Sequence, residues 1–276
     1  MSDLKVRAID FQFDNDIPFY WNRGNSGWGN FVNLVTIIAP AFERYFIKAI
    51  RQALPLIKDP VLQKNADLFC QQEAQHSRQH LAHMRVLTNH YPGLEETRKE
   101  VLDSYETLFA SRTMEFHLSY AASVEQMFGP IARFVIENRE ALFKDCDNRI
   151  AAFMLWHLIE EFEHRHAAID VYKHIVGSYG YRIRSSIDVW KHLMEVELIA
   201  RKGFIKHVPV MPGELAAHDL TSAFKGVPVS RQLGLAYDLF CTLLPLHNPD
   251  SIKQPDWATQ WFADEAAGKD MRLYVP

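Results

Sequence analysis

The order of glutamate and histidine along this chain constrains its fold more than any other feature. A single Glu is followed by a Glu-x-x-His pair, and this order occurs twice. The residues are Glu43, Glu73–His76, Glu125 and Glu161–His164. Residues three apart lie on one face of a helix, so the Glu and the His of each pair can reach the same metal ion. The pattern therefore predicts four helices that direct carboxylates and imidazoles to one point.

Burial strengthens this prediction more than spacing does. A Glu-x-x-His match alone is weak, because about one arises by chance in such a chain, and Glu163–His166 is a third match. The helical neighbours of each Glu are mostly apolar, as Phe46 and Ile50 are around Glu43. A buried, unpaired carboxylate needs a proton, a cation or a metal. Four such carboxylates favour metal.

This ligand order is that of the two-metal site in ferritin-like helical bundles. We therefore expect an all-α protein, a ferritin-like four-helix bundle with additional C-terminal helices. The alternative for any one Glu is a surface position or an ion pair with an arginine. The candidate partners are Arg44, Arg78, Arg133 and Arg165.

Caps and helix breakers predict the limits of the elements. Pro40 suits a helix start, and Asp59-Pro60 and Asp147-Asn148 are typical N-terminal signals. The expected helices span residues 40–54, 60–89, 102–138, 148–176, 184–206, 230–245 and 255–267, with a loop over 207–229. The predicted regions are a loop-rich segment over 1–39, a di-metal bundle over 40–180 and a helical extension over 181–276.

Composition excludes several classes of function. The net charge of −4 gives no electrostatic case for nucleic acid or an anionic membrane. Residues 1–20 contain no apolar run typical of a secretory signal, and no stretch approaches the ~20 apolar residues of a membrane span. The three cysteines, Cys70, Cys146 and Cys241, are sparse, as in a reducing compartment. We expect a soluble, cytoplasmic protein.

Three segments resemble the bacterial family called "predicted metal-dependent hydrolase". They are Ala41–Phe46 (AFERYF), Gln72–His80 (QEAQHSRQH) and Trp156–Arg165 (WHLIEEFEHR). The resemblance covers roughly residues 5–250 and implies a metal-dependent enzyme, although the ligand order is more like that of di-iron oxidases and oxygenases. In the family pattern a His follows the third Glu, whereas Gln126 follows Glu125 here. Adjacent helical positions face about 100° apart, so this difference leaves the predicted ligands intact.

The predicted metal ligands are the two single Glu residues and the two pairs. Each metal ion takes one His, and Glu73 and Glu161 bridge or chelate. Glu160 also lies near the face of His164, but Glu161 repeats the offset of Glu73 and His76. The predicted cofactor is two iron ions, or manganese, because four carboxylates and two imidazoles suit these metals.

Three further residues are candidates for catalytic roles beside the ligands. His80 and His157 lie one helical turn from a ligand and could orient a Glu or carry protons. Satisfied core histidines are the alternative. Glu160 is the third candidate. Glu163 and His166 are expected on the solvent side.

The leading functional hypothesis is an enzyme that activates O2 at two iron ions and oxidises a small organic molecule. It requires an electron donor, which the sequence does not identify. The second hypothesis is hydrolysis by two metal ions, and the third is metal storage or binding without catalysis. The expected partners include a small-molecule substrate but neither nucleic acid nor a membrane. The oligomeric state stays open, a homodimer being one option.

Overall fold

The structure, a computed structural model, is all-α over the residues it describes, which are 4–14, 16–245 and 247–275. The α-helices are α1 (Ser26–Ala53), α2 (Pro60–His90), α3 (Leu94–Ser111), α4 (Met114–Glu137), α5 (Arg139–Leu142), α6 (Asn148–His164), α7 (Ala167–Ile175), α8 (Tyr179–His207), α9 (Val229–Cys241) and α10 (Asp256–Ala266). Short 3-10 turns occupy Leu54–Leu56 and Pro249–Ser251. The expected all-α class is confirmed, whereas the ferritin-like arrangement and the division into regions stay predictions. Residues 1–3, 15, 246 and 276, which fall in the expected terminal regions, lie outside the described residues.

The first helix begins fourteen residues earlier than predicted. Asn25 caps it by accepting a hydrogen bond from the backbone N–H of Trp28, and Pro40 lies inside the helix. Pro40 donates no backbone hydrogen bond, but the residues on either side of it are buried and hold the helix together. The loop-rich segment expected over 1–39 was therefore too long, because residues 26–39 are helical.

Two helices predicted to be continuous are each divided. The helix expected over 102–138 is interrupted at Arg112 and Thr113, both of which have extended backbones. The helix expected over 148–176 ends at His164, and α7 begins only at Ala167. The loop after α8 and the helices α9 and α10 lie close to their predicted ranges.

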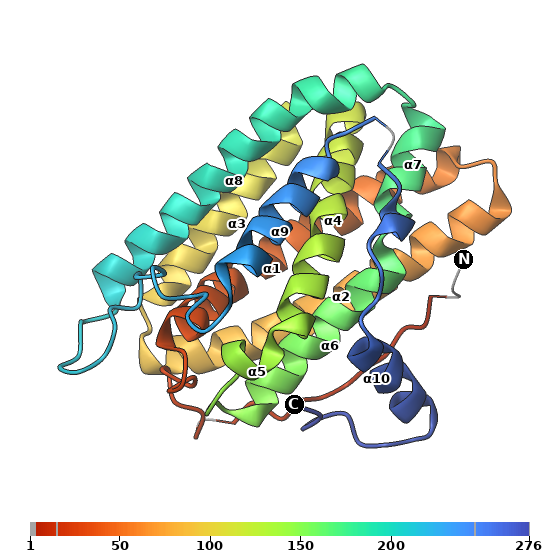
Figure 1. Ribbon diagram of the computed structural model, residues 1–276. Coiled ribbons are helices and arrows are strands. Elements are labelled where there is room, and N and C mark those ends of the chain that lie inside the picture. The colour runs from red at the N-terminus through yellow and green to blue at the C-terminus, as the bar shows by residue number, and fades with distance from the viewer. Residues whose placement is uncertain (1–3, 15, 246, 276) are drawn as a thin grey trace.

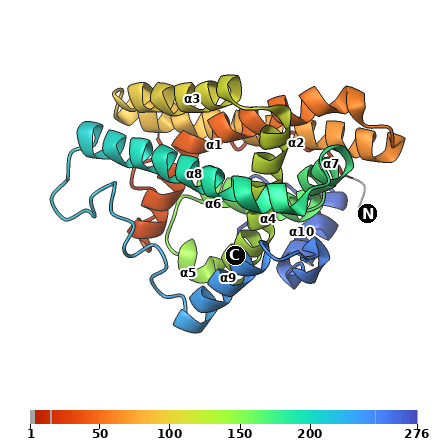
Figure 2. The same cartoon turned by 90° about the horizontal axis from the view of Figure 1, so that it is seen from above.

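The helices that carry the Glu and His pattern pack against one another. Helix α1 packs on α2 and α4, while α6 and α7 pack on both α2 and α4. Helix α3 lies on α1, and α8 lies on α3 and α4. Figure 1 shows the chain before α1 running along the lower edge of the molecule in this view, past α10. Figure 2 shows α3 and α9 on opposite sides of the molecule.

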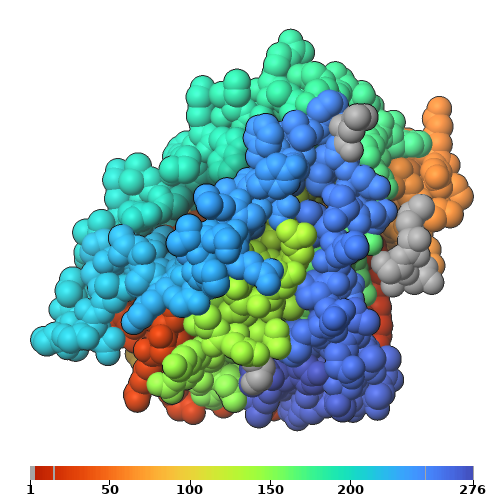
Figure 3. Space-filling model, viewed as in Figure 1, coloured from red at the N-terminus to blue at the C-terminus, as the bar shows by residue number. Residues whose placement is uncertain are grey.

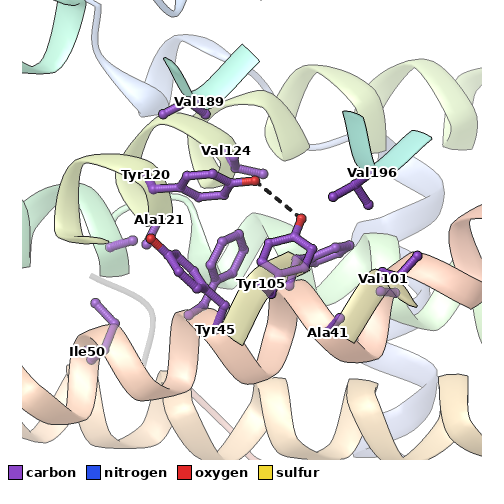
Figure 4. Close-up of a cluster of buried hydrophobic side chains, with 14 of the residues drawn as sticks. Ala41, Tyr45, Ile50, Val101, Tyr105, Tyr120, Ala121, Val124, Val189 and Val196 are labelled. Atoms are coloured by element: carbon purple, nitrogen blue, oxygen red, sulfur yellow. Dashed lines mark hydrogen bonds between the residues drawn. The ribbon is translucent and has the colours of Figure 1, made fainter. Parts of the chain in front are cut away.

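A cluster of buried tyrosines fixes α1 against α3 and α4. Tyr45, Tyr105 and Tyr120, one from each helix, lie together in the core (Figure 4), and the hydroxyls of Tyr105 and Tyr120 are 3.3 Å apart. The Tyr45 hydroxyl lies 2.8 Å from Nδ1 of His117, and the Tyr120 hydroxyl lies 3.0 Å from Nδ1 of His192 on α8. Tyr45 lies two residues after Glu43, so the cluster helps to fix the part of α1 that carries this Glu.

The three cysteines are free. Among the described residues, no helix is both long enough and apolar enough to cross a membrane.

Candidate metal centre

The structure buries every residue predicted as a metal ligand. Glu43 lies on α1, the first pair on α2, Glu125 on α4 and the second pair on α6, and each side chain is at most 2% exposed. The alternative of surface positions is thereby excluded for all four carboxylates.

Ion pairing with an arginine is excluded as well for the carboxylates of the pattern. Arg44 pairs with Glu106, Arg133 with Asp238 and Arg165 with Asp250. Arg78 has no ion-pair partner among the residues that the structure describes. The buried carboxylates must therefore be stabilised by protons, by histidine or by metal.

One group of possible ligands joins α2 and α6. It consists of the two Glu-x-x-His pairs, Glu73–His76 and Glu161–His164, whose ligand atoms lie within 4.8 Å of one another. Nδ1 of His164 is 2.9 Å from Oε1 of Glu73 and 3.5 Å from Oε2 of Glu161. Nδ1 of His76 is 3.8 Å from the same Glu73 oxygen. Bonds of about 2.0–2.2 Å to a common ion would give separations of this size.

A second group joins α1, α2 and α6 and consists of Glu43, His80 and His157. Nε2 of His80 is 3.7 Å from Oε1 of Glu43 and 3.0 Å from Nδ1 of His157. Glu161 connects the two groups, because its Oε1 is 3.0 Å from Nε2 of His157. The three side chains are buried, and their separations also fit one ion of the same size.

The fourth carboxylate, Glu125, lies beside both groups rather than within either. Burial, and after it the charges of Glu161 and Glu73, raises the pKa of Glu125 well above the usual range. Both of its oxygens are buried without a hydrogen-bond partner among the described residues. Glu125 is thus placed to complete the coordination of an ion in either group.

The structure distributes the histidines differently from the sequence-based assignment. We predicted one imidazole for each ion, with His80 and His157 beside the ligands. Instead, His76 and His164 belong to one group, and His80 and His157 supply the imidazoles of the other. The spacing contains a signal for this arrangement. His80 follows His76 by four residues and His157 precedes Glu161 by four, so both lie on the faces of the two pairs.

Glu160 holds His76 in place. Its Oε2 lies 2.9 Å from Nε2 of His76, and its Oε1 accepts a hydrogen bond of 2.8 Å from Arg7. A carboxylate on the outer nitrogen of a histidine fixes the ring and leaves Nδ1 for a metal. Burial, partly offset by Arg7, raises the pKa of Glu160 to about 7.

Arg7 is a site residue that sequence reasoning missed, and Glu163 was placed wrongly. The guanidinium of Arg7 is buried and also donates to Glu163, so this carboxylate is not on the solvent side as predicted. His166 is half-buried and lies 3.0 Å from Asp250. No local signal marks Arg7, because it lies 153 residues from Glu160 along the chain.

Thr36 and His83 extend the second group and were also missed. Oγ1 of Thr36 is 3.3 Å from Nδ1 of His80 and 2.9 Å from Nδ1 of His83. The bond to Thr36 orients the His80 ring so that Nε2 points to Glu43. Burial lowers the pKa of His83 to about 3, so this residue is neutral.

The electrostatics of the centre follow from the crowding of carboxylates. Burial and the charge of Glu73 raise the pKa of Glu43 well above the usual range. Burial alone would raise the pKa of Glu161, but the neighbouring His164 and His157 outweigh it and lower this pKa below the usual range. Burial alone would lower the pKa of His164, but Glu161 and Glu73 outweigh it and raise this pKa well above the usual range. Protons and one histidine–glutamate pair thus stabilise the centre when no cation is bound.

The residues fit a bound metal, because their ligand atoms lack other partners. Oε1 of Glu73, Nδ1 of His76, Oε2 of Glu161 and Nδ1 of His164 are buried and contact one another rather than other parts of the described chain. Nε2 of His164 is buried without a hydrogen bond among the described residues. Buried polar atoms are rarely left in this state. Burial also lowers the pKa of His76 and His80 well below the usual range, which gives the neutral imidazoles that bind metals.

Substitutions in α6 distinguish the ligand from the orienting residue. Glu161→Ala removes a carboxylate that touches both groups, so we expect it to lose at least one of about two ions per chain. Glu160→Ala leaves the ligands in place and should weaken metal affinity about 10- to 100-fold. Elemental analysis and metal titration measure both effects, with the exposed Glu140→Ala as control. Retention of both ions by Glu161→Ala together with their loss from Glu160→Ala would reverse the assignment.

Glu43→Gln should stabilise the metal-free protein. The pKa of Glu43 is higher in the folded protein than its value of 4.5 in the unfolded chain. The protonated side chain therefore contributes its full stability below pH 4.5. This contribution is lost as the pH rises toward the pKa of the folded state. Glutamine has no such dependence. The gain in the free energy of unfolding should therefore grow from about pH 5 to pH 8 and exceed about 1 kcal/mol.

Urea unfolding in the presence of a chelator measures this gain. The exposed Glu140→Gln is the matched control, for which we expect no gain. A gain for Glu43→Gln that shrinks with rising pH would contradict a buried, protonated carboxyl at this position.

Comparison with known proteins places these residues in a family. A family model described as "predicted metal-dependent hydrolase" matches residues 5–249, which include every residue of the two groups as well as Glu125 and Glu160. No curated protein and no solved structure matches the chain. The match covers most of the 276 residues. The chain therefore belongs to the predicted metal-dependent hydrolase family.

Proposed function

We propose that this protein is a hydrolase that uses two metal ions, bound by the Glu73–His76–Glu161–His164 group and the Glu43–His80–His157 group. The observation that carries the proposal is the pair of adjacent buried ligand groups connected by Glu161. The family description supports hydrolysis as the reaction. Iron, manganese and zinc all accept carboxylate and imidazole ligands, so the donor set admits each of them.

Two metal ions supply hydrolysis with a polarised substrate oxygen and a water of lowered pKa. In the overall reaction, the hydroxide part of water goes to the acyl or phosphoryl centre, and the leaving group takes a proton. Glu160 would hold the His76 imidazole in place for the metal through its hydrogen bond to Nε2.

Aromatic rings pack on the imidazoles of the centre. His76 packs against Trp156 with ring centroids 4.9 Å apart, and His164 packs against Phe69 at 5.0 Å. These aromatic rings fix the imidazoles and keep the local dielectric low, which strengthens every charge interaction at the site.

Activation of O2 is a second candidate, favoured by one specific observation. Four buried carboxylates adjoin the centre, and Glu125 has no other partner among the described residues. A carboxylate-rich set on four helices is typical of di-iron proteins and suits iron or manganese. Such an enzyme would also need an external electron donor.

Metal exchange under nitrogen distinguishes the two reactions. For a hydrolase, the zinc- or manganese-loaded protein should cleave p-nitrophenyl esters without O2, chelation should abolish the activity, and zinc should restore it. Glu161→Ala should reduce the rate at least 100-fold, as loss of the bound ions would. His218→Ala, on the loop far from the two groups, is the control and should leave the rate unchanged.

The opposite outcome supports the second candidate. Zinc has no redox chemistry, so an O2-activating enzyme would be inactive with zinc. Its ferrous form would instead consume O2, and this uptake would be lost in His164→Ala. Zinc-loaded protein that cleaves no ester, amide or phosphate ester, together with O2 uptake by the ferrous form, would overturn the hydrolase proposal.

A further inference from the structure

A groove between α1, α2 and α3 lies next to the proposed metal centre. Its volume is about 500 Å³, within the range of small-molecule sites. Figure 2 shows α3 lying along α1 and α2, where the groove runs. Arg44 of α1 and Ser77 of α2 line the groove. Each directly follows a residue of the ligand groups, Glu43 and His76 respectively. The groove therefore runs along the same stretches of α1 and α2 that carry these ligands.

The groove combines apolar side chains with cationic ones. Ile37, Leu81 and Leu102 supply part of its apolar lining. Arg44, Arg78 and Arg98 also line it, and no acidic residue does among the described part of the chain.

Arg78 differs from the other two arginines. The side chain of Arg44 pairs with Glu106, and that of Arg98 pairs with Glu95. Arg78 is exposed and has no ion pair within the described residues. Arginine binds carboxylates and phosphates through paired N–H donors, so Arg78 is free to receive an anionic group.

We propose that this groove binds the substrate, and that the substrate is an ester or amide with an acidic group held by Arg78 and an apolar body held by Ile37, Leu81 and Leu102. The bond to be cleaved then faces Ser77 and the centre behind it. This inference rests on the proposed hydrolase function for the reaction, but the binding of an acidic amphiphile does not depend on it.

Decanoate is a suitable probe, because it has one carboxylate and one apolar chain. Isothermal titration should show that metal-free and zinc-loaded protein both bind decanoate, and that decanol and acetate bind at least tenfold more weakly. Arg78→Ala should weaken decanoate binding about three- to tenfold, and Arg78→Glu should weaken it more.

Arg85→Ala is the matched control, since Arg85 is an exposed arginine two turns further along α2 that does not line the groove. It should bind decanoate as the wild type does. No binding of decanoate, equal binding of decanol, or unchanged binding in Arg78→Glu would overturn the proposal. If decanoate binds as expected but no ester is cleaved, only the hydrolase function fails.

A separate observation concerns another part of the surface, where α8 and α9 expose apolar side chains. On α8 these are Ile187, Trp190, Met194, Leu198 and Ile205, and on α9 they are Val229, Leu233, Tyr237 and Phe240. Helix α9 contains no buried residue. Figure 3 shows both helices on one face. We call these nine residues the α8–α9 face.

The area of this face matches what a stable dimer buries. Each of the nine side chains is between 44% and 68% exposed, and large apolar side chains have areas of about 150–250 Å². The face therefore presents on the order of 900 Å², close to the roughly 800 Å² per partner of a standard interface.

The residues of α8 are also complementary to a second copy of themselves. Trp190 and Leu198 lie four residues before and four residues after Met194. Lys191 and Glu197 lie three residues before and three residues after the same methionine. In an antiparallel pair of α8 helices with a two-fold axis at Met194, apolar residues meet apolar ones. Lys191, which pairs with Asp188 in its own chain, then comes opposite Glu197, which pairs with Arg201. Such self-complementarity is what a two-fold interface requires.

We infer that the α8–α9 face is the interface of a homodimer. Sedimentation should show a dimer for the wild type at micromolar concentration and a monomer for Met194→Glu, with metal content unchanged. Val61→Glu, at an apolar residue of α2 that is 57% exposed, should stay dimeric.

Charge reversal tests the pairing itself. Lys191→Glu and Glu197→Lys should each raise the dimer dissociation constant, and the double variant should restore it. A monomeric wild type, or a monomer that binds neutral phosphatidylcholine vesicles through this face, would overturn the inference.

Discussion

The repulsion between buried carboxylates is the constraint on which the rest of the structure depends. Glu43, Glu73, Glu125 and Glu161 are drawn into one core by the apolar stripes of their helices. Burying one unpaired charge costs several kcal/mol, so four carboxylates are tolerated only with compensating charge or with protons. His164 compensates for Glu161 and Glu73, whereas Glu43 and Glu125 have no cation partner among the described residues. The fold therefore favours any divalent cation that fits between them.

Local spacing predicted the part of the centre that a single helix determines. The offset of three residues placed Glu73 with His76 and Glu161 with His164, as any helix would. The grouping of the histidines depends on how α2 and α6 face each other, because His80 meets His157 across that contact. The same is true of Arg7, whose contact with Glu160 joins the first described residues to α6. Such contacts leave no periodic signal in the sequence.

The errors in the helix limits have the same origin. Pro40 suggested a helix start, yet the buried residues before it continue α1 back to the cap at Asn25. Tertiary burial thus outweighed the local preference of proline. In contrast, the chain breaks at Arg112 and Thr113, before Glu125, and again after His164. The second break separates α7, which contacts both α2 and α4, from α6. The all-α class was robust to these errors because it rests on the apolar periodicity of every segment.

The burial of the centre also determines where a substrate can enter. The ligands and the residues that orient them, Glu160 and Thr36, are covered by the helices that carry them. The pocket at the α8–α9 face, which Trp190 and Phe240 line, contains none of the candidate ligands. The groove of α1, α2 and α3 differs, because its lining residues Arg44 and Ser77 directly follow Glu43 and His76 in the chain. A substrate held there would lie along the stretches of α1 and α2 that carry these two ligands.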